Sequence, residues 1–434
     1  MENLSHQKII EELLPQKFGK AGKIWVGVLL VFCAVGLIAY IRQLSKGLEV
    51  TAMRDYASWG VYISSFVFFA GISLVGSVLT ASLRLINVPW RTPLMRIAEM
   101  IAVSAIIFTS LVIIVDMGRP DRIFNLFIHG RVQSPIIWDV VVIITFTLVN
   151  IFLLYFLLLP DIQILISMKE KTGKFAHTIY KLLGSFWKNT PEQTKINDKA
   201  INILSFTIII MAFAMPTSWL FATVYRPGWD STNFGVYFIS GAFLSGAGAV
   251  LIAMYVFRKF YKLENYITEE HFDRISKLVI VLAVLYLYFN INEYLVPAYK
   301  MKKADESYLL GLLSGGYAPL FWISVLMSMI IPIFTLLMNK GRKPFPAFVV
   351  GILVVIGSWL KRYVIVIPTL LHPLIPMHDV PESYRQYFPT WEEWAITMGS
   401  LAGALLIITL IARYYPIVAI QKTINEIDKH HDKA

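Results

Sequence analysis

Ten apolar stretches of about 20 residues or more divide this chain, and no other feature restricts its fold as strongly. In α-helical form a stretch of that length crosses a bilayer, because each residue adds about 1.5 Å and the hydrocarbon core is about 30 Å thick. The sequence therefore predicts an all-α integral membrane protein with ten transmembrane helices. The predicted spans are 24–44, 56–83, 94–116, 135–159, 200–222, 233–257, 274–296, 317–338, 345–370 and 393–415.

Composition and charge agree with a multi-pass membrane protein. Charged residues make up only 15% of the chain, against about 25% in a typical soluble domain. Loops on the side of the N-terminus hold 26 Lys and Arg residues, and the opposite loops hold 11. Because positively charged loops remain in the cytoplasm, we expect the cytoplasmic (inner) membrane, with both termini cytoplasmic. This topology accounts for the net charge of +11, so we expect no nucleic acid partner.

Two pairs of segments indicate an internal repeat. "WGVYISSFVFFAG" (59–71) and "FGVYFISGAFLSG" (234–246) share six residues at an offset of 175. "SPIIWD" (134–139) at the start of one span corresponds to "APLFWI" (318–323) at the start of another, with the same Pro and Trp spacing. The matches occur in the same order along the chain, which favours duplication of a multi-helix unit.

The repeat unit contains four spans, and Asp116 at the end of the third span corresponds to Glu293 at the end of the seventh. Because four is even, both copies point in the same direction across the membrane. We expect two parallel four-helix bundles with two flanking helices. The predicted units are a tail at 1–23, a flanking helix at 24–44, bundles at 56–222 and 233–370, a flanking helix at 393–415 and a tail at 416–434.

Polar and aromatic residues gather at one end of the first predicted bundle, where "VDMGRPDR" (115–122) closes the third span. By parity, the beginnings of the second and fourth spans reach the same outer end. Polar groups at membrane depth are costly unless they have partners, so they are candidates for function. The candidates are Trp59, Tyr62, Asp116, Arg119, His129, Trp138 and Asp139.

This combination suits a flat apolar ring that carries two oxygens, such as a quinone. Apolar and aromatic walls hold the ring, Arg, Tyr or His donors meet the oxygens, and a carboxylate exchanges the protons. The alternative is structural: Asp116, Arg119 and Asp121 cap helices and hold the loop.

The second predicted bundle has different charges. Ile323 takes the position of Asp139, while Lys361 and Arg362 lie inside a span and need partners, of which Glu293 is the expected one. These charges could form a static ion pair or belong to a polar path for protons, and the sequence does not decide between the two interpretations. The proton-path candidates are Glu293, Lys361, Arg362 and Tyr363.

Metal cofactors are not expected in this chain. The eight His residues lie at span ends or in loops, whereas a transmembrane haem needs imidazoles that face each other inside a bundle. Cys33 is the single cysteine, and one thiol cannot hold an iron–sulfur cluster or a structural zinc. If this chain takes part in redox chemistry, a partner protein must supply the electron carrier.

The cytoplasmic side contains two further features. "FAHTIYKLLGSFWK" (175–188) is apolar on one side and basic on the other, which suits either a helix on anionic membrane lipids or a docking site for a cytoplasmic protein. Arg84, Arg96 and Glu99 lie near span ends, where we expect them to be paired or to extend toward the interface.

The motifs "DMGRPDR", "SPIIWD", "GSWLKRYVIVIP" (357–368) and "YFPTWEEWAITMGSLAG" (387–403) together resemble the NrfD-like family, which includes the polysulfide reductase membrane subunit. Ten spans are closest in size to members from alternative complex III and quinone reductase complexes. The resemblance implies a haem-free quinone-binding subunit that exchanges electrons between the quinone pool, menaquinone in particular, and an extracytoplasmic four-cluster ferredoxin-like iron–sulfur subunit. Further redox subunits and proton translocation are also implied.

The resemblance also suggests roles for the candidates. Trp59, Tyr62, Arg119, His129 and Trp138 would bind the quinone, and Asp116 or Asp139 would handle its protons. Two other hypotheses are a secondary transporter, which also uses repeats and midplane charges, and a membrane anchor without quinone chemistry.

Overall fold

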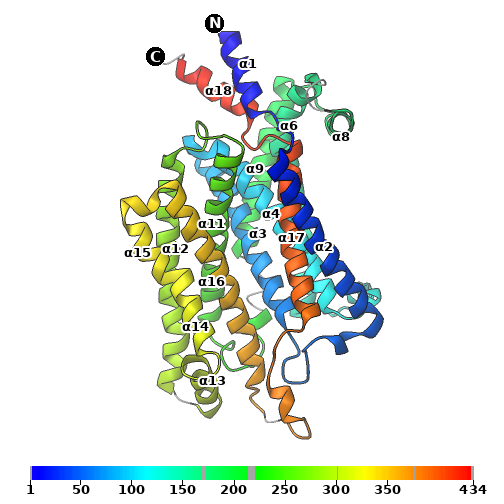
Figure 1. Cartoon of the computed structure of the whole chain (residues 1–434), viewed down its shortest axis with the longest axis vertical. Helices are drawn as coiled ribbons and strands as arrows, with labels where there is room; N and C mark the ends of the chain where they lie inside the picture. The colour runs from blue at the N-terminus through cyan, green and yellow to red at the C-terminus, as the bar shows by residue number, and fades with distance from the viewer. Residues whose placement is uncertain (1, 169–172, 214–219, 301, 376, 432–434) are drawn as a thin grey trace.

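The computed structural model describes residues 2–168, 173–213, 220–300, 302–375 and 377–431, and every regular element among them is a helix (Figure 1). The long helices are α2 (Lys20–Lys46), α3 (Val61–Ile86), α4 (Thr92–Asp116), α6 (Pro135–Ser167), α9 (Pro191–Phe213), α11 (Phe234–Phe260), α12 (Glu269–Lys300), α16 (Pro344–Leu371) and α17 (Trp391–Tyr414). One further long helix is made of three consecutive parts, α14 (Ala318–Val325), the π-helical turn η4 (Leu326–Ile330) and α15 (Ile331–Leu337). The shorter helices are α1 (Glu2–Leu13), η1 (Leu48–Val50), η2 (Pro89–Arg91), η3 (Pro120–Arg122), α5 (Asn125–Ile128), α8 (Lys174–Leu183), α13 (Lys303–Leu313), η5 (Asn339–Arg342), η6 (Glu382–Arg385) and α18 (Ile420–His431).

The prediction of an all-α integral membrane protein is confirmed. In the part of the chain that the structure describes, nine helices are long and apolar enough to cross a membrane, with α14, η4 and α15 forming one of them. These nine match nine of the ten predicted spans. The remaining predicted span, 200–222, coincides with α9 as far as Phe213, and its residues 214–219 lie outside the described residues.

Local sequence explains where several helices begin and end. Pro135 and Pro319 stand in the first turn of α6 and α14, where a missing N–H costs nothing. Asn87 closes α3 in a left-handed conformation. The second predicted span began at residue 56, but α3 starts at Val61, because residues 51–60 bend to contact the start of α17 through long-range hydrogen bonds.

Helix contacts form two rings of four helices each. The first ring consists of α3, α4, α6 and α9, and the second consists of α11, α12, α15 and α16. The central helix α3 joins the rings by packing against α11 and α16. Outside the rings, α2 packs along α17, and α17 packs on α4 (Figure 1).

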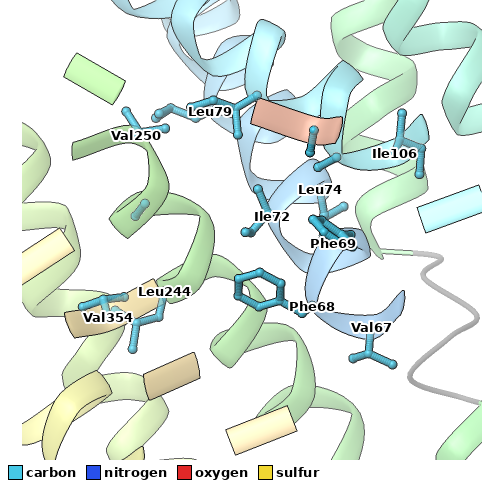
Figure 2. Close-up of a cluster of buried hydrophobic side chains, with 14 of the residues drawn as sticks. Val67, Phe68, Phe69, Ile72, Leu74, Leu79, Ile106, Leu244, Val250 and Val354 are labelled. Carbon is cyan, nitrogen blue, oxygen red and sulfur yellow. The ribbon is translucent and has the colours of Figure 1, made fainter. Parts of the chain in front are cut away.

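Apolar side chains fill the junction between the rings. Figure 2 shows Phe68 and Ile72 of α3 facing Leu244 of α11 and Val354 of α16. These four side chains are at most 8% exposed. Because lipid is as apolar as a protein core, van der Waals packing rather than hydrophobic transfer holds such helices together.

The two rings share details that fit a parallel repeat. Trp59, before α3, stacks on Trp229, before α11, with ring centroids 6.0 Å apart, so these helices begin at the same level. Trp138 of α6 donates its indole N–H to a carbonyl of the preceding loop at 2.7 Å, and Trp322 of α14 donates to the carbonyl of Leu313, the last residue of α13, at 3.1 Å. Both indoles are about half exposed.

Both termini lie at one end of the molecule, together with α1, α8 and α18; we call this the terminal end and the opposite one the distal end (Figure 1). At the terminal end, Arg96 and Asp161 form a buried ion pair at 2.6 Å, and Asp161 accepts the first N–H groups of α18. Arg84 pairs with Asp198 at 2.6 Å, while Glu99 is fully buried. In α8, the Tyr180 hydroxyl donates to the Tyr414 carbonyl.

Candidate functional site

The turn after α4 explains the Gly-Arg-Pro-Asp-Arg sequence. Gly118 has φ +66°, a left-handed conformation, and a Cβ there would lie 2.8 Å from the side chain of Leu48. Arg119 and Asp121 form an exposed ion pair at 3.2 Å. The Arg119 hydrogen bond holds the pKa of the Asp121 carboxyl below its usual range. The Arg119 guanidinium is therefore paired with Asp121 at the protein surface.

A hollow of about 410 Å³ lies at the distal end, between the end of α4 and the start of α6, within the range of small-molecule sites. Its lining is formed by Met117, Arg122, Asn125, Leu126, His129, Gly130, Arg131, Ser134, Ile136 and Ile137. Met117 and Ile137 offer apolar surface, whereas Arg122, His129 and Arg131 offer hydrogen-bond donors. The hollow can therefore hold a ring and meet its polar substituents.

Tyr62 lies at the same end, on the first turn of α3, and is fully buried. Its hydroxyl donates to Oε1 of Gln43 at 2.7 Å, and Nε2 of Gln43 donates to the Val115 carbonyl at 2.9 Å. The Gln43 amide, which belongs to the flanking helix α2, therefore links α3 to the last turn of α4.

Asp116 follows that carbonyl directly and is half-buried. Its Oδ1 is enclosed and has no hydrogen-bond partner among the described residues. Tyr62 and Glu393 are both within electrostatic reach of Asp116, so the structure brings Tyr62 and Asp116 together. The next residue, Met117, lines the hollow, whereas Asp116 is not among the lining residues.

Glu393, which the sequence patterns did not single out, organises the distal end. It is fully buried on the first turn of α17. Its Oε2 accepts from the backbone N–H of Ala52 at 2.8 Å and of Thr390 at 2.9 Å, and its Oε1 accepts from the Tyr387 hydroxyl at 2.5 Å. Tyr387 in turn accepts the N–H of Val61 at 2.8 Å. One carboxylate thus connects α17, the segment before α3, and α3 itself.

Neighbouring residues fit this network closely. Burial, followed by the charge of Glu393, raises the pKa of the Tyr387 phenol far above its ordinary value, so the phenol remains a donor. A Cβ on Gly60 would lie 2.3 Å from the Tyr387 hydroxyl. Tyr363 lies against the Tyr387 ring, 6.3 Å between centroids. The spacing from Thr390 to Glu393 is a capping-box pattern, a local signal that could have found Glu393.

The other predicted residues of the first bundle are dispersed. Trp59 stacks on Trp229 at the junction of the two rings. Trp138 is 52% exposed and bonded to the Val132 carbonyl. Asp139 is buried on α6. His129 lines the hollow, so of the seven predicted residues it is the one that contributes directly to that surface.

In the second ring, the expected ion pair of Glu293 with Lys361 or Arg362 is not formed. Glu293 instead accepts from the hydroxyl of Ser231 at 2.7 and 2.8 Å and from the amide of Asn233 at 2.9 Å. These donors stand just before α11 and satisfy the carboxylate, so it needs no ion pair with a residue of α16.

The two cations use aromatic rings and carbonyls as partners. Lys361 Nζ lies 4.0 Å from the ring centroid of Phe321 and 3.4 Å from the Tyr294 hydroxyl. Arg362 lies over the Phe238 ring at 4.2 Å and donates to the Phe238 carbonyl at 2.9 Å. Cation–π contacts are strongest where water is excluded, and both side chains are at most 2% exposed.

Comparison with known proteins identifies the family. The sequence model of the family described as polysulphide reductase, NrfD, matches residues 49–373. The chain belongs to the NrfD family. The match covers both rings and leaves out Gln43 on α2 and Glu393 on α17.

Three NrfD-related proteins illustrate the range of similarity. The chain is 23% identical over 417 residues to a selenate reductase subunit of Mesobacillus selenatarsenatis, covering 93% of this chain and 96% of that protein. It is 23% identical over 413 residues to the integral membrane subunit of menaquinone reductase from Nitratidesulfovibrio vulgaris, covering 92% and 93%. It is 28% identical over 239 residues to a putative dimethyl sulfoxide reductase membrane subunit of Halobacterium salinarum, covering 54% of this chain and 52% of that protein.

No group of three or more His, Cys, Asp or Glu side chains within the described ranges is arranged to hold a metal ion.

Proposed function

We propose that this NrfD-family protein is the quinone-binding membrane subunit of a respiratory oxidoreductase complex. It exchanges electrons between the quinone pool, in particular menaquinone, and an extracytoplasmic iron–sulfur subunit. The names of the relatives support a subunit of a reductase complex, and one of them is a menaquinone reductase subunit. Haem and iron–sulfur clusters belong, in this proposal, to partner chains.

The proposal is carried by the hollow of about 410 Å³ that follows α4, together with the enclosed Asp116 oxygen at the end of that helix, which has no hydrogen-bond partner among the described residues. A quinone ring needs apolar walls, donors for its oxygens and a group that exchanges protons. Met117 and Ile137 supply walls, and His129 and Arg122 supply donors. An enclosed carboxylate oxygen without a partner is unfavourable unless a ligand or a proton satisfies it, which fits a substrate hydroxyl.

The roles follow from placement. Oxidation of a quinol releases two electrons and two protons, and we assign the protons to Asp116 and Asp139, which line the ends of α4 and α6. His129 binds a quinone oxygen. Arg119 stays with Asp121 at the surface, where it suits contact with a partner better than contact with the ring. We keep Trp59 and Trp138 as supporting walls.

The loop around the hollow also suits a partner protein. Phe124, Phe127, Ile128 and Val132 are between 56% and 70% exposed in a loop beyond the ends of α4 and α6. Clustered apolar residues outside the lipid are normally covered by another protein. We propose that the iron–sulfur subunit, of the four-cluster ferredoxin type, binds here and that further redox subunits bind to it. The distal end then faces away from the cytoplasm, and both termini lie inside the cell, in the cytoplasmic membrane.

We assign Glu293, Lys361, Arg362 and Tyr363 to a polar region that couples proton movement to electron transfer. Lys361 connects to this region through Tyr294, whose hydroxyl lies 3.5 Å from that of Tyr237.

Secondary transport is the less favoured function. It predicts interrupted helices at corresponding positions in both repeats. The second repeat has the π-helical turn η4, but the corresponding helix α6 is continuous from Pro135 to Ser167.

The proposal is tested by quinol oxidation and quinone reduction in the purified complex. Asp116→Asn and Asp139→Asn should each lower kcat/KM by at least about 100-fold, the lower limit for lost general acid–base groups. Asp121→Asn, a matched change in the exposed loop, should remain near wild type. Full turnover of the Asp116→Asn and Asp139→Asn variants in an intact complex would exclude these roles, and an assembled complex without quinone turnover would favour an anchor.

A further inference from the structure

Helix α8 is fixed to the terminal end of the spans by one of its faces. Tyr180 is buried in a cluster with Ile162 of α6, and its hydroxyl donates to the carbonyl of Tyr414, the last residue of α17. The Tyr155 hydroxyl of α6 donates to the Leu183 carbonyl at 2.8 Å. Figure 1 shows α8 beside the terminal end and seen nearly along its own axis, whereas the spans run from top to bottom. The axis of α8 therefore crosses the spans, as in a helix that lies on a membrane surface.

A second face of α8 is apolar and exposed. Phe175 is 69% exposed and Leu182 is 75% exposed, and the half-buried Ile179 lies between them. Their spacing of four and then three residues places all three on one side of the helix. Phe186, just after the helix, continues the series and is 86% exposed. We call these four residues the apolar stripe.

Three exposed lysines form a row beside the apolar stripe. Lys174, Lys181 and Lys188 are seven residues apart, which is almost two helical turns. Lys174 and Lys181 each directly precede a member of the stripe, so the row lies about 100° around the helix from it. No carboxylate in the described part of the chain pairs with these ammonium groups. The row can therefore bind anions outside the protein.

The lipid-exposed face of α6 leads directly to α8. Leu148, Ile151 and Phe152 are between 42% and 52% exposed. Tyr155, which binds α8, follows Ile151 and Phe152 by one turn on the same side of α6. Helix α8 therefore lies where this lipid-covered face of α6 ends. The acyl chains that cover α6 are the nearest apolar partner for the stripe, whereas a soluble protein would have to displace them.

We propose that α8 lies on the membrane surface and is a binding site for anionic lipids. The apolar stripe enters the acyl-chain region of the leaflet at the terminal end, and the lysine row binds headgroup phosphates. Lysine side chains are long enough to reach the headgroups from such a position. The opposite face keeps its contacts with α6 and α17, so lipid bound at α8 also stabilises the ends of these two spans. This site is separate from the hollow at the distal end.

The test places a lipid-sensitive label on the apolar stripe. The purified complex carries Cys33→Ala and Leu182→Cys, labelled with a small apolar fluorophore, in nanodiscs of phosphatidylcholine with or without phosphatidylglycerol. Lipids brominated in their acyl chains should quench this label strongly when phosphatidylglycerol is present, and less without it. A label at Val31→Cys, on the lipid-exposed side of α2, should be quenched equally in both kinds of disc.

Charge variants test the lysine row. Each lysine beside an anionic surface strengthens binding about fivefold. Lys174→Gln combined with Lys181→Gln should therefore raise the phosphatidylglycerol fraction that gives half of the full quenching about 25-fold. Lys340→Gln combined with Lys343→Gln, a matched change of two exposed lysines at η5, should leave this fraction unchanged. In the unlabelled wild-type complex, hydrogen exchange of α8 should slow when phosphatidylglycerol is added.

Three results would overturn the proposal. An unquenched label at Leu182→Cys, beside a quenched label at Val31→Cys, would place the stripe outside the acyl chains. Equal quenching with and without phosphatidylglycerol, unchanged in the Lys174 and Lys181 variant, would exclude anionic lipid as the ligand. A label that is shielded from a water-soluble quencher only after cytoplasmic protein is added would assign the stripe to a protein partner instead. Should the labelled complex not assemble, hydrogen exchange of α8 that does not respond to phosphatidylglycerol would overturn the proposal in the wild-type complex.

Discussion

Removal of the Glu393 carboxylate should weaken the distal end more than any other single change to an acidic residue there. Glu393→Ala removes the three shortest hydrogen bonds to this carboxylate, from the N–H groups of Ala52 and Thr390 and from the Tyr387 hydroxyl, at a site with no exposure. Hydrogen bonds to a charged group contribute about 1.5–3 kcal/mol each. Even at the lower value the loss is about 4–5 kcal/mol, comparable to the whole stability of a marginal domain. Glu393→Gln keeps one acceptor oxygen and should cost about 2 kcal/mol.

The neighbouring residue provides a matched control. Glu392 is also on the first turn of α17, but it pairs with the half-exposed Arg42 at 3.3 Å. Glu392 itself is 4% exposed, but because Arg42 is open to solvent the pair is screened and should contribute about 1 kcal/mol. Thermal melting of the purified complex should give Tm values in the order wild type, Glu392→Gln, Glu393→Gln and Glu393→Ala, from highest to lowest. Equal melting of Glu392→Gln and Glu393→Gln would refute the view that Glu393 organises this end.

Three further changes test other parts of the account. Gly118→Ala should destabilise the protein by about 1–3 kcal/mol, seen as a lower Tm, because φ is +66° and Leu48 occupies the Cβ position; an unchanged Tm would contradict this. Asp161→Ala should cost about 3–5 kcal/mol, because Arg96 stays buried and uncompensated, and should make α18 sensitive to protease; a protected α18 would argue against its capping role. Burial lowers the pKa of Lys422 to about 8, so the fold disfavours the protonated form. Lys422→Met should therefore raise Tm relative to wild type at pH 7, and the difference should shrink as pH rises through 8 toward 10; a difference independent of pH would contradict this.

The sequence predicts the spans well, because the length of an apolar run is a local property that the bilayer fixes. The misplaced start of α3 illustrates the limit. Residues 56–60 are apolar enough to extend the helix, but a contact between Ala52 and Glu393, separated by 341 residues, bends the chain there. No pattern within one span contains that information.

In the candidate site, too, the sequence predicts what a single span determines and does not predict what the packing of helices determines. Parity gives the level of a residue along the membrane normal, so it places Tyr62 and Asp116 at one end, where Gln43 links the helices that carry them. It does not give the rotation of a helix about its axis. Trp138 therefore faces outward, and Arg119 turns toward Asp121. Gln43 was missed because a single amide in a lipid-facing helix gives no signal until its partners on α3 and α4 are placed.

The hydrogen bonds of Glu293 explain why the expected ion pair with Lys361 or Arg362 is not formed. Opposite charges at similar depth predict an ion pair, but Ser231 and Asn233 satisfy the carboxylate locally. Lys361 finds the face of Phe321 instead. Aromatic residues are abundant, at 14% of the chain, so rings compete effectively with carboxylates as partners for buried cations.

The central claim is that a quinone binds in the hollow between α4 and α6. Photolabelling of the purified complex with an azido-quinone, followed by peptide mapping, measures this directly. The account predicts adducts within residues 117–137, and their loss when excess menaquinone is present. Adducts confined to α12 or α16, or labelling that menaquinone does not reduce, would contradict it.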